Sequence, residues 1–127
     1  MSKRPAVAKS ELEVVQLVWQ LGHASVRQVL DALPADRGLD FKTVQTYLRR
    51  LEAKGYLRSR REGRAQVYAA RVRPELVIRE VVDGFVHRLF GGEAIPLFQH
   101  LIEDRGLSDA EIGQLRAMLD RLENRAS

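Results

Sequence analysis

The chain has 127 residues, of which 45% are hydrophobic and 30% are charged, and it contains no cysteine. This composition is typical of one small globular domain, or of two that share a core, and excludes fibrous and disordered proteins. Without cysteine, a disulfide framework, a thiolate nucleophile and Cys-ligated metal sites are excluded. No apolar run reaches the roughly 18 residues of a spanning helix. No secretory signal is recognised, so the cytoplasm is the expected location.

Charge divides the chain into two halves. Residues 1–73 contain 15 Lys and Arg against 7 Asp and Glu, a net charge of +8, whereas residues 74–127 contain 6 against 10, a net charge of −4. A basic half joined to an acidic half indicates that only the first half contacts a polyanion. Pro74 marks the expected boundary between a domain at 1–73 and a second domain at 74–127.

The N-terminal segment is predicted to begin as a disordered basic arm at residues 1–9, followed by an amphipathic helix. Ser10 and Glu13 have the spacing of a capping box, so Ser10 is the expected N-cap, and Gly22 ends the helix. The apolar residues at helical spacing, which should face the core, are Leu12, Val15, Val18, Trp19 and Leu21.

Two further helices follow before the first β-structure. Ser25 begins a short helix with a capping box, and Asp40 is the expected N-cap of a longer helix that runs to Lys54. The longer helix is the third in the chain, and its predicted core face consists of Val44, Leu48 and Leu51.

A β-hairpin is predicted after the third helix. Residues 56–61 and 64–70 contain strand-forming side chains on either side of a turn with Gly63, and a very short strand is expected near Ala24. The order helix, helix, helix, hairpin predicts a winged helix-turn-helix domain.

The third helix has an outer face without acidic residues. No Asp or Glu occurs between Phe41 and Leu51, although a solvated helix face normally mixes both signs. Hydroxyl, carboxamide and guanidinium groups are the side chains that reach base edges in the major groove of DNA. The predicted base-reading residues are Thr43, Gln45, Thr46 and Arg49. A solvated polar face is the structural alternative.

Arginines crowd the hairpin. Six Lys and Arg lie from Lys54 to Arg71, against a single acid, Glu62. These cations repel one another, and binding to DNA phosphates would explain why they are concentrated in one hairpin. The alternative explanation is that the charges protect an edge strand against aggregation. The predicted DNA-phosphate residues are Lys42, Arg50, Arg60, Arg61 and Arg64.

Three helices are predicted in the second half, at about 75–90, at about 94–104, and after a capping box at Ser108. The 54 residues are too few to bury three apolar helix faces alone, so we expect a homodimer. A ligand pocket among Phe85, Phe90, Phe98 and Ile102 is the alternative. The predicted dimerisation residues are Ile78, Val82, Phe85, Leu89, Phe98, Leu101, Ile102, Ile112, Leu115, Leu119 and Leu122.

Several motifs together resemble the BlaI/MecI/CopY family of penicillinase-type repressors over about residues 10–122. The most specific is the Thr-Val-x-Thr…Arg-Leu-x-x-Lys-Gly pattern that starts at Thr43 and ends at Gly55. The other matching segments are Glu11 to Gly22, Lys54 to Leu57, Gly63-Arg64 with Tyr68, Leu89 to Gly92, Leu101 to Glu103, Leu107-Ser108, and the final helix with Leu115-Arg116 and Leu119.

This resemblance implies a homodimeric transcriptional repressor that binds a palindromic double-stranded DNA operator. Members of the family are often released when a membrane-bound sensor protease leads to cleavage of the repressor. The family's scissile Asn-Phe pair aligns with His100-Leu101, which are the candidate cleavage residues although the residue types differ. The family's copper branch uses a cysteine metal site, which this chain cannot form.

The expected fold class is mainly α with a small β-hairpin: a winged helix-turn-helix domain followed by a three-helix dimerisation domain. The alternative function is a winged-helix protein-interaction module without specific DNA binding, which would require apolar or acidic residues on the third helix. An enzyme is not expected, because His23, His87 and His100 are far apart and no catalytic pattern surrounds them. No cofactor, no metal and no membrane insertion are expected.

Overall fold

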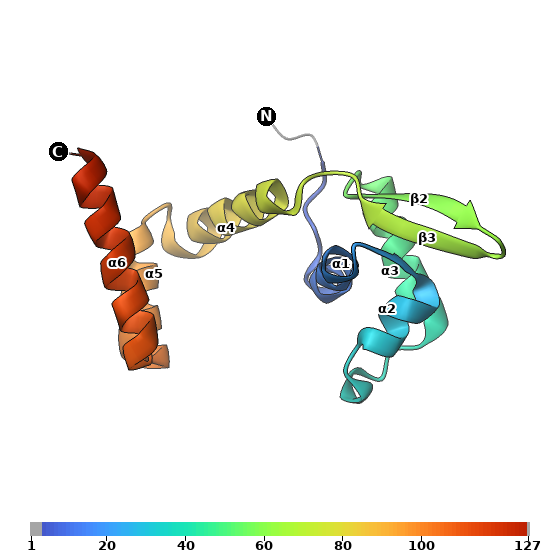
Figure 1. Cartoon of the computed structure of the whole chain (residues 1–127), viewed down its shortest axis with the longest axis horizontal. Helices are drawn as coiled ribbons and strands as arrows, with labels where there is room; N and C mark the ends of the chain where they lie inside the picture. Colours follow the sequence, from blue (N-terminus) through green and yellow to red (C-terminus); the bar gives the residue numbers. More distant parts are fainter. Residues whose placement is uncertain (1–3, 127) are drawn as a thin grey trace. The chain divides into compact units, whose positions relative to one another are not determined.

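The computed structural model describes residues 4–126, and its elements follow the predicted order (Figure 1). The chain forms two compact units, Met1–Val82 and Asp83–Ser127, and helix α4 contributes to both. Mainly helical structure with one small antiparallel sheet confirms the predicted fold class. The elements are α1 (Lys9–Leu21), β1 (His23–Ser25), α2 (Val26–Ala32), η1 (Ala35–Arg37), α3 (Phe41–Ala53), β2 (Leu57–Glu62), β3 (Ala65–Ala70), α4 (Pro74–Phe90), α5 (Ala94–Gln99), the π-helical η2 (His100–Arg105) and α6 (Asp109–Ala126).

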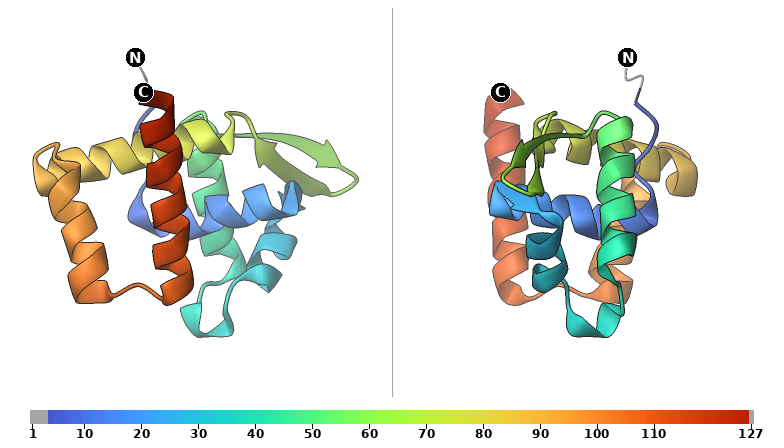
Figure 2. Two further views of the ribbon diagram at one scale, coloured as in Figure 1. Left: turned by 60° about the vertical axis from the view of Figure 1, so that its left-hand side comes forward. Right: turned by 90° about the vertical axis from the view of Figure 1, so that its right-hand side faces the viewer.

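The sheet has the strand order β1-β3-β2, with both pairings antiparallel. The short strand expected near Ala24 is present, and Ala24 is paired with Tyr68. In the left view of Figure 2 the turn between β2 and β3 extends beyond helices α1 to α3. Gly63 in that turn has φ +62°, a backbone conformation that glycine adopts without steric cost. The hairpin therefore presents its tip away from the helical core.

Helices α1, α2 and α3 enclose one apolar core with the inner face of the sheet. The predicted core face of α3 is confirmed, because Val44, Leu48 and Leu51 are fully buried. Val77 of α4 is buried in the same cluster, so the first part of α4 belongs to this unit. The remaining buried apolar residues are Val14, Val15, Val18, Ala24, Val26, Val29, Leu33, Tyr56, Leu57, Val67 and Tyr68.

The predicted core face of α1 is partly wrong. Leu21 is 46% exposed, whereas Val14, absent from the prediction, is fully buried. The buried stripe of α1 includes Glu11. Because a hydrophobicity pattern assigns an acidic residue to the surface, it misplaces the centre of the buried face.

The predicted cap of α1 is also wrong. Helix α1 begins at Lys9 with Ala8 as N-cap, and the backbone N–H of Ala8 donates to Glu11 Oε1 at 2.9 Å. Glu13 instead accepts from Arg37 at 2.8 Å. Glu11 is held at this position because its buried carboxylate also pairs with Lys54 of α3.

The other predicted caps are confirmed. Ser25 and Gln28 form a reciprocal capping box, as do Ser108 and Glu111. The carboxylate of Asp40 accepts the backbone N–H of Thr43 at 2.8 Å, and this hydrogen bond lowers the pKa of Asp40 below its usual value. Helix α3 therefore starts at Phe41 in a defined orientation.

The arm predicted to be disordered is ordered from Arg4 onward, and residues 1–3 lie outside the described residues. Arg4 donates to both carboxylate oxygens of Glu80 at 3.0 Å, and its guanidinium lies 5.5 Å from the ring centroid of Tyr56. The Tyr56 hydroxyl donates to the carbonyl of Pro5 at 2.6 Å. The prediction failed because Glu80 is 76 residues from Arg4, beyond any local sequence pattern.

The second unit contains the end of α4, then α5, η2 and α6. The helix predicted at about 94–104 is present, but its second half is the π-helical η2, where His100 Nδ1 and Asp104 Oδ2 are 2.8 Å apart. An apolar cavity of about 200 Å³ lies between these segments and α6, and Phe98, Leu101 and Leu115 contribute to its wall. All described apolar side chains of α5 and α6 remain at least partly exposed.

Candidate nucleic-acid interface

Helix α3 presents a polar face opposite its buried stripe. Because Val44, Leu48 and Leu51 fix one side of the helix in the core, the intervening residues are exposed or half-buried. The Thr46 hydroxyl donates to the carbonyl of Lys42 at 3.0 Å, so its methyl group and its oxygen lone pairs are the groups left for a ligand. The predicted DNA-contacting residues of this face are Lys42, Thr43, Gln45, Thr46, Arg49 and Arg50.

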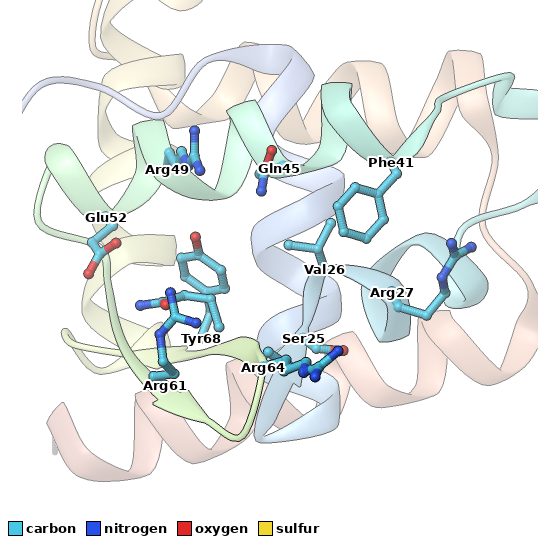
Figure 3. Close-up of a pocket in the computed structure, with 12 residues that line it drawn as sticks. Ser25, Val26, Arg27, Phe41, Gln45, Arg49, Glu52, Arg61, Arg64 and Tyr68 are labelled. Carbon is cyan, nitrogen blue, oxygen red and sulfur yellow. The ribbon is translucent and has the colours of Figure 1, made fainter.

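A hollow of about 470 Å³ lies between α3, the start of α2 and the hairpin (Figure 3). Gln45 and Arg49 line it from α3, Arg61 from β2, and Arg64 from the turn that follows. Arg27 adds a fourth guanidinium from α2, and Glu52 is the acidic residue among the described lining residues. Four cations around one hollow favour a polyanionic ligand.

The structure therefore brings two predicted base-reading residues, Gln45 and Arg49, together with two predicted phosphate residues, Arg61 and Arg64. Arg60 is placed elsewhere. Neighbouring residues of a strand point to opposite faces of the sheet, so Arg60 lies beside Arg58 and His23 around a separate hollow of about 140 Å³. Arg60 also pairs with Glu62.

A hydrogen-bond chain ties the hairpin to α3. Gln66 Nε2 donates to Ser59 Oγ at 2.8 Å, and Ser59 Oγ donates to Glu52 Oε2 at 2.6 Å. Tyr68 lies in the same region, and burial, with the nearby Glu52 carboxylate, raises the pKa of its hydroxyl despite the opposing effect of Arg49. Tyr68 is therefore a neutral phenol at neutral pH. This network fixes the hairpin relative to the polar face of α3.

Sequence reasoning missed Arg27, Phe41 and Glu52 at this site. Arg27 was overlooked because Asp31 lies four residues later and gives α2 an ordinary mixed-charge face. The signal available for Phe41 was its position at the N-terminus of the third helix, where a recognition helix contacts bases.

Residues predicted to form a dimer lie on the surface of the single chain. The most exposed are Leu89, Leu119 and Leu122, whereas Leu101 and Leu115 are half-buried against the cavity beside α6. Across residues 4–126 no helix is long and apolar enough to cross a membrane. In the same range no group of His, Asp and Glu side chains is arranged to hold a metal ion.

A helix-turn-helix domain whose third helix has a polar face without acidic residues from Phe41 to Leu51, beside an arginine-rich hairpin, defines a winged-helix DNA-binding protein. The penicillinase repressor family model matches residues 7–121, and the chain belongs to this family. Members of the family are transcriptional repressors rather than enzymes, and this chain is a repressor of the BlaI type with a winged-helix DNA-binding domain.

Individual relatives agree with the family assignment. The penicillinase repressor of Bacillus licheniformis is 30% identical over 98% of both chains. The methicillin resistance regulatory protein MecI of Mammaliicoccus sciuri is 23% identical over 94% of this chain and 98% of its own length. The solution structure of the DNA-binding domain of the repressor BlaI covers 58% of this chain and 90% of its own, with 34% identity and a TM-score of 0.51.

Proposed function

We propose that this chain is a homodimeric repressor that binds a palindromic operator in the cytoplasm. In this proposal residues 1–73 bind DNA and residues 74–127 form the dimer. The observation that carries it is the convergence of Arg49, Arg61 and Arg64 on one hollow beside the polar face of α3. A twofold dimer would place two such faces about one turn of DNA apart, roughly 34 Å, which matches two half-sites of a palindrome.

Within each half-site we assign two roles to the basic and polar residues. Thr43, Gln45, Thr46 and Arg49 read bases in the major groove, because their side chains offer donors and acceptors to base edges. Lys42, Arg50, Arg61 and Arg64 hold phosphates and set the position of α3. Arg60 is proposed for the same role, and its pairing with Glu62 on the other face of the hairpin makes it the weakest contributor.

The two roles predict different results for two arginines that line the same hollow. Arg49→Ala is expected to weaken operator binding by about 1–3 kcal/mol and to relax the preference at one base pair. Arg64→Ala is expected to weaken cognate and random duplexes alike, and to lower the slope of log K against log salt by about 1. Fluorescence anisotropy with both duplexes at several salt concentrations measures both quantities.

Arg60→Ala is the matched control, since it removes the same charge from the other face of the hairpin. Its effect on binding is expected to be smaller than that of Arg64→Ala. Equal effects of Arg49→Ala on cognate and random duplexes would show that Arg49 does not read a base. A wild-type chain that did not distinguish the two duplexes would support the protein-interaction alternative.

Release of the repressor is proposed to follow loss of the dimer. Cleavage between His100 and Leu101, triggered by a membrane-bound sensor protease, is the route that the resemblance to penicillinase-type repressors implies. His100 is exposed at the start of the π-helical η2, and Leu101 contributes to the cavity wall beside α6. A cut at this bond would detach α6 and its apolar face from the DNA-binding domain.

A further inference from the structure

Phe41 places a large apolar ring on the polar face that the proposed function assigns to DNA. Its side chain is 40% exposed, although α3 buries its other large apolar side chains wholly or in part. The ring lines the same hollow as Gln45 and Arg49 (Figure 3). An apolar group in this place would gain free energy from contact with an apolar group of the ligand.

Phe41 occupies the position on α3 from which a recognition helix contacts base edges. Phe41, Gln45 and Arg49 are spaced four residues apart, so they follow one side of the helix. Phe41 is the first residue of α3, and the N-terminal residues of a recognition helix are those that contact bases. The three side chains thus form a row that begins with an aromatic ring and continues with a carboxamide and a guanidinium.

Neighbouring residues hold the Phe41 ring in place. The guanidinium of Arg27 lies 5.5 Å from the ring centroid, within the range of a cation–π contact. Arg27 is itself 3.9 Å from the carboxylate of Asp31, and Val26 also lines this part of the hollow. The N-cap Asp40 fixes the backbone of the first turn of α3, and Arg27 contacts the ring in the chain without DNA.

Base chemistry then limits what this ring can recognise. In the major groove, most base edges present hydrogen-bond donors and acceptors. The apolar group that a base presents there is the C5-methyl of thymine. Phenylalanine is among the side chains that make apolar contacts with this methyl group. We propose that Phe41 is a specificity-determining residue that reads the methyl group of one thymine in each operator half-site. This inference rests on the proposed function, in which α3 enters the major groove.

The test removes the methyl group from DNA and the ring from the protein, separately and together. An operator recovered by selection of bound genomic fragments is synthesised in versions in which one thymine at a time is replaced by deoxyuridine. Deoxyuridine lacks only the C5-methyl group. Binding of the full chain and of Phe41→Ala to each duplex is measured by fluorescence anisotropy, and thermal unfolding by circular dichroism checks that the variant folds.

At one thymine in each half-site, replacement by deoxyuridine is expected to weaken binding of the wild-type chain about fourfold. This factor corresponds to the free energy of burying one methyl group. Phe41→Ala is expected to bind the unmodified operator more weakly than the wild-type chain does. Replacement of that thymine by deoxyuridine is not expected to weaken the binding of Phe41→Ala any further. Phe41→Leu keeps an apolar group and is expected to retain part of the preference, so it gives the answer if Phe41→Ala does not fold. Lys42→Ala, a proposed phosphate contact, is expected to keep the full preference for thymine.

If every deoxyuridine affects wild type, Phe41→Ala and Phe41→Leu equally, Phe41 is a packing residue and the inference is overturned. The wild-type chain and Arg49→Ala separate this failure from a failure of the proposed function. A wild-type chain that prefers the selected operator, with Arg49→Ala relaxing that preference at one base pair, leaves the proposed function intact. A wild-type chain without any preference for the selected operator overturns both.

Discussion

A charge introduced at Leu119 is expected to dissociate the homodimer and to weaken binding to the full operator by about 100-fold. Leu119 is 59% exposed on α6 in the single chain and follows Ile112 and Leu115 along one apolar side of that helix. Burying an unpaired carboxylate in a dimer interface costs several kcal/mol, so Leu119→Asp favours the separated protomers. Sedimentation velocity and operator titration measure the two effects.

The loss of affinity follows from effective concentration rather than from damage to α3. Two linked DNA-binding domains bind two half-sites more tightly because the second contact is intramolecular. Leu119→Asp is therefore expected to bind an isolated half-site as tightly as the wild-type chain. A fragment of residues 1–100, which imitates cleavage before Leu101, is expected to behave in the same way.

Ala117→Asp is the matched control, since Ala117 is exposed on the side of α6 opposite to Leu119 and receives the same charge. It is expected to leave both dimerisation and operator binding nearly unchanged. A wild-type chain that remains monomeric at tens of micromolar, or a Leu119→Asp variant that stays dimeric, would rule out this interface.

Removal of the amino group of Lys54 is expected to destabilise the first unit by about 3 kcal/mol. Lys54 Nζ is 2.8 Å from Glu11 Oε1, and the side chain of Glu11 is only 1% exposed. In Lys54→Met the carboxylate stays in the core without its cation. The free energy of unfolding is measured by urea denaturation, followed by the fluorescence of Trp19, which packs against the core.

Glu11→Gln in the Lys54→Met background is expected to restore most of the lost stability. A neutral carboxamide removes the buried charge, and its oxygen still accepts the backbone N–H of Ala8. Arg37→Met is the control, because its ion pair with Glu13 is exposed to solvent and contributes little. No difference between Lys54→Met and the wild-type chain, or no recovery with Gln at position 11, would contradict the role given to this pair.

Much of the fold could be predicted because its signals are local. Ser25, Asp40 and Ser108 cap their helices through residues three positions away, and Gly63 marks the hairpin turn. The core face of α3 follows from helical spacing alone. These features depend on neighbours within one or two turns of the chain, where a sequence pattern carries the necessary information.

The features that were missed depend on contacts between distant residues. The buried carboxylate of Glu11 is neutralised by Lys54, 43 residues later in the chain. Arg4 is ordered because it forms an ion pair with Glu80 and a cation–π contact with Tyr56. Hydrophobicity patterns place a glutamate and an arginine at the surface, so neither contact could be anticipated. The N-cap of α1 and the order of the N-terminal arm were therefore predicted incorrectly.

In the candidate site, too, features with a local sequence signal were predicted and features that depend on distant contacts were missed. The polar face of α3 was predictable from spacing, whereas the separation of Arg60 from Arg61 required knowledge of which hairpin face lies toward α3. Arg27 and Phe41 come from different helices, and their contact across the turn exists only in the folded domain.

Mapping of backbone amide chemical shifts with and without the selected operator tests the central claim most directly. The account predicts that the largest changes fall on α3 around Thr43 to Arg49, on Arg27, and on the hairpin at Arg61 and Arg64. It also predicts that a random duplex at higher salt produces none of these changes. Tight, specific operator binding with changes confined to other surfaces of the described chain would contradict the account, because DNA would then be bound elsewhere.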